Sequence, residues 1–533
     1  MYELKLENIK YQNTGYFSKT VTDYLSQKET IKPFYGNFPN LKNFAKQIAL
    51  KQASFQLESK IVLVNTLKNQ YKNIETSTKT AQNINLLQKE NTFTITTGHQ
   101  LNLFTGPLYF LYKIISTINL CEQLKVEYPQ QNFVPIYWMA TEDHDFEEIQ
   151  YFNFNTKKII WNSNNKGAVG RFSTQGLEHV FTQIESLFKS GDNAKKLRNL
   201  FKKSYLEHNN LTDATRYLTN ELFKNYGLVI IDADDTKLKK EFIPFVKDEL
   251  LNQSSHKEVG KTIDEFSKNY KIQVNPREIN LFYLTDDFRE RILFDGKKYN
   301  INNTKISFSK EEMLIEIEKF PKRFSPNVIL RPLYQEIILP NLCYIGGGGE
   351  LAYWFELKAY FEKVNVVFPI LLLRNSALIM TKKQEQKLAK LSITKEELFL
   401  KQHELIQKKV TELSNLNLDF SQQKEFLKKQ FSHLKEIAAQ TDKSFIGAVN
   451  AQEKKQLNGL ENLEKRLLKA EKRKHQELVK RINIIQEQLF PKQSLQERYI
   501  NFSEMYLEFG EELIPSLKNS LQPLDLEFSV ISL

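Results

Sequence analysis

The stretch from residue 382 to residue 490 contains no proline and only two glycines, Gly447 and Gly459. Because proline and glycine are the residues that most weaken a helix, this stretch favours long uninterrupted helices. Apolar residues recur every three or four positions in two parts of its second half, first at Leu460, Leu463, Leu467 and Ala470 and then at Ile482, Ile485 and Leu489, with an interruption at Lys474. That rhythm is typical of a coiled-coil seam.

The length of this helical stretch also predicts a partner. A continuous helix from about 445 to 490, ended by Pro491, would be about 65–70 Å long at 1.5 Å per residue. One small core cannot cover a helix of that length, so it needs a partner helix from this chain or from another. We therefore predict a long helical arm that forms an antiparallel coiled coil.

The segment from 91 to 375 has a different pattern, in which apolar strand-like runs alternate with helical spacing. A β-rich run at 91–97, a helix that begins at Pro107 and a continuous apolar run at 133–140 together predict a βαβ unit, and hence a parallel sheet. Further strands are expected at 227–235, 327–333, 342–349 and 366–375, and a small hairpin around 281–299. The fold class is therefore α/β, with a doubly wound, Rossmann-like parallel-sheet core.

Three parts of the chain are expected. Residues 1–378 form the core with insertions at about 150–225 and 236–325, residues 379–490 form the coiled-coil domain, and residues 491–533 return to the core. No apolar run is long enough to cross a bilayer, and no signal peptide is visible, so we expect a cytoplasmic protein without a membrane partner. Two cysteines, Cys121 and Cys343, exclude a disulfide scaffold and a thiolate-rich metal site.

The net charge of the chain leaves several partners open. Lysine and arginine exceed aspartate and glutamate by 75 − 64 = +11. Nucleic acid, an anionic surface or an anionic substrate is compatible with that excess. However, the basic part of the arm has neither an arginine-rich nor an aromatic-interleaved patch, so we expect no nucleic-acid partner.

The first candidate site is the turn after the strand at 91–97. Thr96, Thr97, Gly98 and His99, followed by Gln100, fit the T-x-G-H turn that lies under nucleotide phosphates in nucleotide-transferring Rossmann enzymes. Glycine there lets the backbone approach, and the histidine donates to a phosphoryl oxygen. The alternative is a plain strand-to-helix turn.

The second candidate site is the acidic run at 141–148, directly after the apolar run at 133–140. Asp143, His144 and Asp145 could hold a metal, orient a substrate ammonium or act as a base. The alternative is a solvated acidic helix start, because carboxylates favour a helix N-terminus.

The third candidate site is the run of four glycines at 346–349, which Glu350 and Tyr353 follow. Consecutive glycines can form a nest of N–H groups for phosphate or carboxylate, although a flexible loop or a bulge is the alternative. The run lacks the Lys-Ser/Thr of a P-loop. Arg331 and Arg374, each after a predicted strand, are candidate anion clamps, and a structural ion pair is the alternative for Arg331.

Several long blocks of this sequence resemble one known family, the BshC cysteine ligases of bacillithiol biosynthesis. They are TTGHQLNLFTGPLY, VPIYWMATEDHDFEEI, FSPNVILRPLYQEIILPNLCYIGGGGELAYW, LLLRNS and LQERYINF, in that order along the chain. The resemblance implies a Rossmann-like core related to class I nucleotidyltransferases and a coiled coil that makes a homodimer. It also implies that L-cysteine is added to the amine of glucosaminyl-malate, with an ATP/ADP-type nucleotide site, and it establishes no metal.

The resemblance and the motifs together give a set of candidate residues. The candidate catalytic residues are His99, Gln100, Asp143, His144 and Asp145. The candidate nucleotide-binding residues are Thr97, Gly98, Gly106, Gly346, Gly347 and Gly348. The candidate substrate-binding residues are Arg331, Tyr334, Glu350, Tyr353, Arg374 and Asn375. Since the family commonly has glutamine at the position of His99, Gly98 and Gln100 are stronger candidates in this turn than His99.

These residues suggest a mechanism. The cysteine carboxylate would attack the α-phosphate of ATP to give an adenylate, with Gly98, His99 and Gln100 stabilising the transferring group. Asp143 and Asp145 would hold an ammonium or a metal, and His144 would be the base for the amine. The glycine loop with Arg331 would bind the malate carboxylates. The alternatives are a class I nucleotidyltransferase or synthetase-like enzyme acting on another substrate or RNA, and a coiled-coil adaptor without activity.

Overall fold

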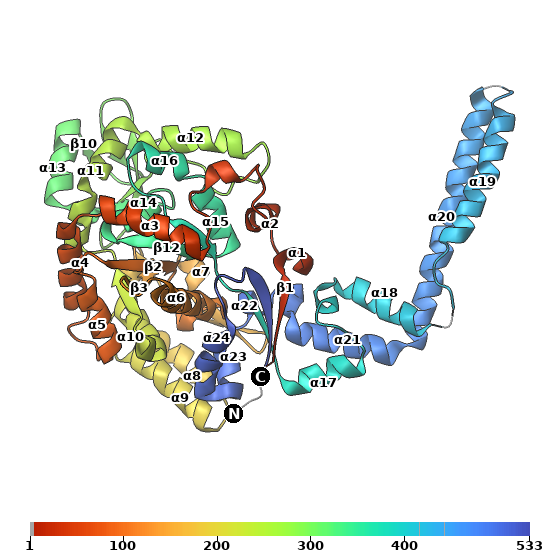
Figure 1. Ribbon diagram of the computed structural model, residues 1–533, viewed down its shortest axis with the longest axis horizontal. Coiled ribbons are helices and arrows are strands. Elements are labelled where there is room, and N and C mark those ends of the chain that lie inside the picture. Colours follow the sequence, from red (N-terminus) through yellow and green to blue (C-terminus); the bar gives the residue numbers. More distant parts are fainter. Residues whose placement is uncertain (1–4, 415, 442) are drawn as a thin grey trace. The chain divides into compact units, whose positions relative to one another are not determined.

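A computed structural model of the chain describes residues 5–414, 416–441 and 443–533 (Figure 1). The chain divides into two compact units. The first contains the described part of Met1–Gln12 together with Tyr16–Leu378 and Gln496–Ile531. The second contains Asn13–Gly15, the described part of Ile379–Leu495, and Ser532–Leu533.

A five-stranded parallel sheet lies at the centre of the first unit, in the order β13-β12-β2-β3-β6. Its strands are β2 (Thr92–His99), β3 (Asn132–Met139), β6 (Val229–Asp232), β12 (Asn341–Gly346) and β13 (Ile370–Leu373). Almost every residue in them is buried, as expected for a parallel sheet covered on both faces. The predicted α/β core with a parallel sheet is therefore confirmed.

The first crossover of this sheet follows the predicted pattern. Pro107 precedes α6 (Tyr109–Glu127), which connects β2 to β3 and packs on both strands. One face of α6 contributes Leu120, Cys121 and Leu124 to the core of the sheet. At the end of β2 the chain therefore turns sharply into a buried helix, and the turn lies at the carboxyl edge of the sheet.

One predicted strand is wrong. Residues 327–333 contain the start of helix α14 (Leu330–Ile338) instead of a strand. The run looks strand-like because it is apolar, but the side chain of Asn327 accepts hydrogen bonds from the N–H groups of Ile329 and Leu330, which start a helix. Pro332 fits the first turn of α14, where no N–H is needed.

The insertion after β3 packs a hairpin against helices. Its elements are α7 (Phe146–Ile149), β4 (Tyr151–Phe154), β5 (Lys157–Ile160), α8 (Leu177–Leu187), α9 (Asp192–Phe201) and α10 (Leu211–Phe223). The strands β4 and β5 pair antiparallel.

The insertion after β6 contains a second, antiparallel sheet in the order β10-β9-β8-β7-β11. The predicted hairpin is confirmed as β7 (Leu281–Leu284) and β8 (Arg289–Phe294). Ser309 and Glu312 form a capping box at the start of α13. The other elements of this insertion are α11 (Thr236–Asn252), α12 (Ser254–Phe266), β9 (Tyr299–Ile301), β10 (Ser307–Phe308), α13 (Lys310–Lys319) and β11 (Phe324–Pro326).

The remaining elements of the first unit lie at its two ends and around β13. They are β1 (Lys5–Lys10), α1 (Tyr11–Thr14, which continues into the second unit), α2 (Lys19–Leu25), α3 (Leu41–Ser54), α4 (Leu57–Gln70), α5 (Thr78–Leu86), α15 (Gly348–Phe355), α16 (Lys358–Lys363), β14 (Ala377–Met380), α22 (Gln496–Tyr499), α23 (Phe502–Phe509), α24 (Leu513–Ser520) and β15 (Glu527–Ser532). The strands β1, β15 and β14 form a third sheet.

The second unit is helical. It contains α17 (Lys382–Lys390), α18 (Gln402–Leu413), α19 (Ser421–Ala438), α20 (Lys443–Lys474) and α21 (Gln476–Leu489). Figure 1 shows α19 and α20 side by side, and Phe431, Ala438 and Val449 form their shared core. The predicted coiled coil is confirmed, and its partner helix comes from the same chain.

The predicted continuous helix from 445 to 490 is broken at His475, whose φ of −99° and ψ of 31° leave the helical region. The break falls next to Lys474, where the apolar rhythm is interrupted. On the two sides of it the seam differs: Ile482, Ile485 and Leu489 are buried, whereas Leu463 is 52% exposed. Among the described residues, no helix is both long enough and apolar enough to cross a membrane.

Candidate active site

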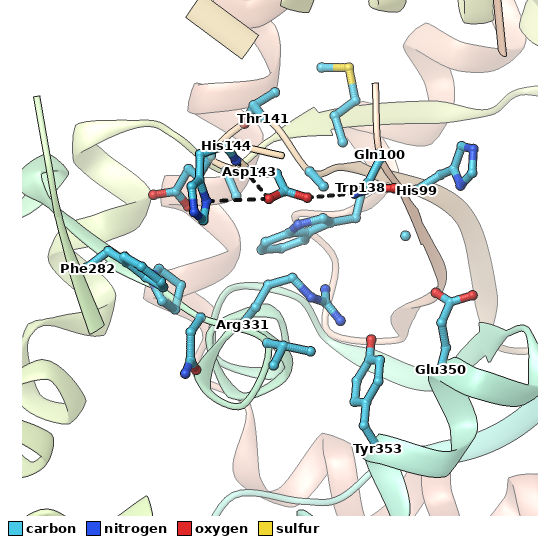
Figure 2. A pocket seen from close by; sticks show the side chains of 18 of the residues that line it. His99, Gln100, Trp138, Thr141, Asp143, His144, Phe282, Arg331, Glu350 and Tyr353 are labelled. Carbon is cyan, nitrogen blue, oxygen red and sulfur yellow. Dashed lines mark hydrogen bonds and ion pairs between the residues drawn. The ribbon is translucent and has the colours of Figure 1, made fainter. Parts of the chain in front are cut away.

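A cavity of about 790 Å³ opens at the carboxyl edge of the parallel sheet (Figure 2). The residues that follow β2, β3 and β6 form one side of it, and α14 and α15 contribute Arg331, Glu350 and Tyr353. The antiparallel sheet supplies the other side through β7 and β8. Open parallel sheets place their ligands at this edge, so the cavity is the candidate active site of the first unit.

About half of the residues predicted from the sequence meet in this cavity. Its lining includes Gly98, His99, Gln100, Asp143, His144, Arg331, Glu350 and Tyr353. The lining does not include Asp145, Thr97, Gly106, Gly346, Gly347, Gly348, Tyr334, Arg374 or Asn375. Asp143 therefore lines the cavity and Asp145 does not, although the sequence alone gave both aspartates the same predicted role.

Asp143 is held by its neighbours in a fixed orientation. Its Oδ1 accepts the N–H of His144 at 2.7 Å, and its Oδ2 accepts a hydrogen bond from Gln100 Nε2 at 2.8 Å. The same Gln100 nitrogen donates to Glu148 Oε2 at 2.9 Å. Gln100 therefore connects the turn after β2 to the loop after β3 and positions the Asp143 carboxylate (Figure 2).

Asp143 also differs from the other two carboxylates of the lining. Glu142 Oε1 lies 2.6 Å from Lys239 Nζ, and Glu350 Oε2 lies 2.6 Å from Lys113 Nζ. Burial opposes the charge of Glu350, but Lys113, Tyr344 and the N–H of Gly347 hold its pKa below the usual value. Within the described parts of the chain, Asp143 has no lysine or arginine within ion-pair distance, so it is the cavity carboxylate available to a substrate cation.

The tautomer of His144 follows from its contact with Arg289. Arg289 Nη1 lies 2.7 Å from His144 Nδ1, and a guanidinium can only donate. Nδ1 is therefore the acceptor, and the proton of the neutral ring sits on Nε2. Burial and the Arg289 charge both lower the pKa of His144. His144 thus presents an N–H donor, which does not suit the predicted role of a base.

Arg289 is itself fixed by three other contacts. Its Nε donates to Ser325 Oγ and its Nη2 to the Pro326 carbonyl, each at 3.0 Å. Its guanidinium carbon lies 4.0 Å from the centre of the Phe282 ring. The sequence analysis did not identify Arg289 or its cavity neighbours Arg277, Arg291 and Lys113. The available signal was the pair of arginines two residues apart in RERILF, which a strand places on one face.

The glycine run has packing roles that explain it without a ligand. A Cβ on Gly346 would lie 2.9 Å from Leu351 Cδ1, and one on Gly348 would lie 2.9 Å from Val21 Cγ2. The N–H of Gly347 already donates to Glu350 Oε2 at 2.8 Å, which caps α15. A nest that binds an anion needs free N–H groups, and the N–H of Gly347 is already used by Glu350. The anion-binding role of Gly346, Gly347 and Gly348 stays a prediction.

The other predicted residues outside the lining have structural partners. Thr97 Oγ1 donates to the Ile345 carbonyl, and Tyr334 Oη donates to the Ala233 carbonyl. Asn375 exchanges hydrogen bonds with Ser116. A Cβ on Gly106, which has a φ of +63°, would lie 2.6 Å from Asn102 Cβ, so the turn before α6 requires glycine there.

Arg374 forms a buried ion pair. Its Nη2 lies 2.8 Å from Glu497 Oε1, and both side chains are almost wholly buried. Glu497 also accepts hydrogen bonds from Ser376 Oγ and the N–H of Ala377. This network gives Arg374 a structural function inside the first unit.

His99 is buried between aromatic rings. Its ring centre lies 5.1 Å from that of Phe110 and 5.5 Å from that of Tyr109. Figure 2 shows the ring directed away from the Asp143 and Gln100 side chains. Burial, reinforced by Lys113, lowers the pKa of His99 to about 3, so the ring is neutral at pH 7.

This lowered pKa predicts a pH-dependent contribution to stability. The unfolded chain takes up a proton at His99 near pH 6.5 and the folded chain does so only near pH 3. Between these values the unfolded state binds more protons, so the stability contribution is full above pH 6.5 and is lost as the pH falls. Relative to His99→Gln, the wild type should lose up to about 1.4 kcal/mol per pH unit below pH 6.5.

Denaturant unfolding at pH 7, 6 and 5 measures this difference. The control is His179→Gln, at a position on α8 outside the cavity lining. If the free energy of unfolding changes with pH in the same way in the wild type and in His99→Gln, the buried imidazole does not cause the loss of stability.

No group of three or more histidine, cysteine, aspartate or glutamate side chains in the described part of the chain is placed to hold a metal ion. Cys121 and Cys343 are both free and buried. The cavity lining contains the Asp143 carboxylate, the imidazoles of His99 and His144 and several guanidinium groups.

Comparison with known proteins gives matches along the whole chain. Residues 4–375 match the family described as "Bacillithiol biosynthesis BshC, N-terminal Rossmann-like domain", and residues 377–533 match "Bacillithiol biosynthesis BshC, C-terminal coiled-coil domain". A protein of Flavobacterium johnsoniae named "Putative cysteine ligase BshC" is 60% identical over 98% of this chain and 99% of its own length. Proteins of the same name are 40% identical in Cytophaga hutchinsonii, over 98% of each chain, and 29% identical in Bacillus thuringiensis, over 93% and 94%.

Proposed function

The chain belongs to the BshC family of bacillithiol biosynthesis, and on that premise we propose that it is a ligase that joins L-cysteine to the amine of glucosaminyl-malate. The observation that carries this proposal is the unpaired carboxylate of Asp143 in a cavity otherwise rich in guanidinium groups. An amine substrate with an anionic end needs both features. The product is the amide that completes bacillithiol.

The amine must lose a proton to become a nucleophile. At neutral pH the glucosamine nitrogen binds as an ammonium, for which the Asp143 carboxylate is the matching partner. Gln100 and the backbone N–H of His144 hold that carboxylate, so it is preorganised to receive the proton. The Nε2–H of His144 is a donor that can stabilise the negative charge developing on the carbonyl oxygen of the cysteine.

A nucleotide of the ATP type fits the side of the cavity near β2. Arg331 Nη2 is a buried donor without a hydrogen-bond partner among the described residues, and phosphate oxygens are acceptors. Gly98 lies next to it: a Cβ there would be 3.9 Å from Arg331 Nη1 and 3.2 Å from Tyr344 Oη. When bound, the nucleotide would activate the cysteine carboxylate, which by itself is a poor electrophile. Gly98 and Arg331 are the residues proposed to hold its phosphates.

Reconstitution with purified components tests the function. The protein, L-cysteine, glucosaminyl-malate and ATP should give bacillithiol and release AMP, both measured by mass spectrometry. Product without consumption of ATP would remove the nucleotide from the proposal and leave the ligase. No product with all components present, from protein whose folding is verified by circular dichroism, would contradict the ligase.

The coiled coil is the proposed surface of a homodimer. Leu463 on α20 and Phe426, Leu434 and Ile437 on α19 are exposed apolar side chains of the hairpin. A second copy of the same hairpin would cover them. The two reduced cysteines and the small-molecule substrates support the cytoplasm as the proposed location.

A further inference from the structure

The cavity contains four arginines, Arg277, Arg289, Arg291 and Arg331, and none of them has a carboxylate partner. In the parts of the chain that the structure describes, no aspartate or glutamate oxygen lies within 4.0 Å of their guanidinium nitrogens. Three arginines elsewhere in the same unit are paired with carboxylates: Arg171 with Asp234 and Asp286, Arg323 with Glu316, and Arg374 with Glu497. Two others, Arg198 and Arg216, donate to backbone carbonyls instead. The cavity therefore concentrates positive charge that the protein itself leaves without counter-charge.

Three of the four arginines lie on one wall. Arg289 and Arg291 are two residues apart on β8, so they lie on the same face of the strand, about 6–7 Å apart along it. Arg277 comes from the segment before β7. Glu290, between the two, is outside the cavity lining, and its Oε2 accepts a hydrogen bond from Asn303. We call Arg277, Arg289 and Arg291 the arginine wall.

The members of the arginine wall differ in how they are held. Arg289 is half-buried and is fixed by Ser325, Pro326 and His144. Arg291 is also half-buried, and its guanidinium makes no hydrogen bond or ion pair with any residue that the structure describes. Replacing Arg291 therefore breaks no such contact within the described parts of the fold, and its N–H groups are available to a ligand in the cavity that it lines.

We propose that the arginine wall is the subsite for the dicarboxylate end of the amine substrate, an inference that rests on the proposed function. Guanidinium groups bind carboxylates by two parallel hydrogen bonds, and two guanidiniums a strand repeat apart match two carboxylates on one short carbon chain. Bound there, the substrate directs its other end toward Asp143, because Arg289 contacts His144, which is adjacent to Asp143 in the chain. The glycine run, expected to bind this end, lies outside the cavity lining.

A nucleotide is the other anionic ligand that could use these groups. Its proposed place is at Gly98 and Arg331, on β2 and α14. Arg289 and Arg291 are on β8 of the antiparallel sheet, which supplies the other side of the cavity. The nucleotide phosphates and the dicarboxylate are therefore assigned to different groups of the cavity. Kinetic constants measured for each substrate in turn distinguish the two assignments.

Arg291→Gln tests the subsite. It should raise KM for glucosaminyl-malate about ten- to a hundredfold, the effect of losing one hydrogen-bonded charge partner, and should leave KM for ATP and for L-cysteine within about twofold. The matched control is Arg198→Gln, the same change at a half-buried arginine outside the cavity lining whose guanidinium donates to the Lys189 carbonyl. This change should leave all three constants unchanged. A rise in KM for ATP or for L-cysteine, with that for glucosaminyl-malate unchanged, would overturn the assignment.

A binding measurement separates this inference from the proposed function. L-malate alone should raise the melting temperature of the wild type and of Arg198→Gln, but not of Arg291→Gln. If no ligation is detected but this pattern holds, the dicarboxylate subsite stands and the proposed function fails. If ligation proceeds and Arg291→Gln leaves KM for glucosaminyl-malate unchanged, the subsite is refuted and the proposed function stands.

Discussion

Asp143→Asn should lower kcat for ligation about a hundred- to ten-thousandfold, the usual contribution of a positioned general base. Asparagine keeps the shape of the side chain, and its carbonyl can still accept the N–H of His144. It cannot take a proton from the substrate ammonium, and its amide would face Gln100 Nε2, which now donates to Asp143 Oδ2. The measurement is the steady-state rate of bacillithiol formation across saturating substrate concentrations.

Asp145→Asn is the matched control for this variant. Asp145 is exposed, lies outside the cavity lining, and makes no side-chain cap to α7. Its replacement should change kcat by less than about threefold. Equal losses in the two variants would point to the charge of the acidic loop as a whole, and an unchanged rate in Asp143→Asn would remove Asp143 from the chemistry.

Arg374→Met should destabilise the first unit by about 3–5 kcal/mol, because it leaves a buried carboxylate without its cation. Glu497 would keep the hydrogen bonds from Ser376 and Ala377 but lose the charge that compensates its burial. The three tryptophans of the chain, Trp138, Trp161 and Trp354, all lie buried in the first unit. Denaturant unfolding followed by tryptophan fluorescence therefore reports the stability of this unit.

A second substitution separates a structural role from substrate binding at Arg374. Arg374→Met combined with Glu497→Gln removes both charges and keeps an acceptor for Ala377. We expect the double variant to be more stable than Arg374→Met alone. A wild-type unfolding midpoint for Arg374→Met, together with a raised substrate KM, would support the predicted role of Arg374 in substrate binding instead.

Local patterns in the sequence predicted most of the elements because those patterns reflect local physics. Buried strands such as 133–140 appear as continuous apolar runs, and Ser309 with Glu312 appears as a capping box. The pattern failed at 327–333, where an apolar run is equally compatible with a buried helix. The pattern also failed at His475, where the helix breaks. The polar residues Lys474 and His475 interrupt the apolar seam, and such an interruption is compatible with a continuous helix as well as with a broken one.

The sequence predicted where the candidate site lies, but not which side chains line it. Parallel strands end at one edge, so the turns after 91–97 and 133–140 had to meet there. Which of their side chains reach the cavity depends on the loop that follows each strand. Asp143 and Asp145 are both carboxylates of one loop, and only the first is held by Gln100, 43 positions away in the chain.

By itself, the sequence determined the two-part organisation, the parallel sheet, the coiled coil and the sheet edge at which the candidate site lies, because each depends on periodicity or on strand order. Only the tertiary structure decided which charged side chains of the cavity are paired and which tautomer His144 adopts. Lys113 and Lys239 neutralise two of the cavity's three carboxylates, and Arg289 sets the tautomer of His144. Ion pairing and desolvation depend on groups that are distant in the chain, so the unpaired carboxylate and the arginine wall appear only once the chain is folded.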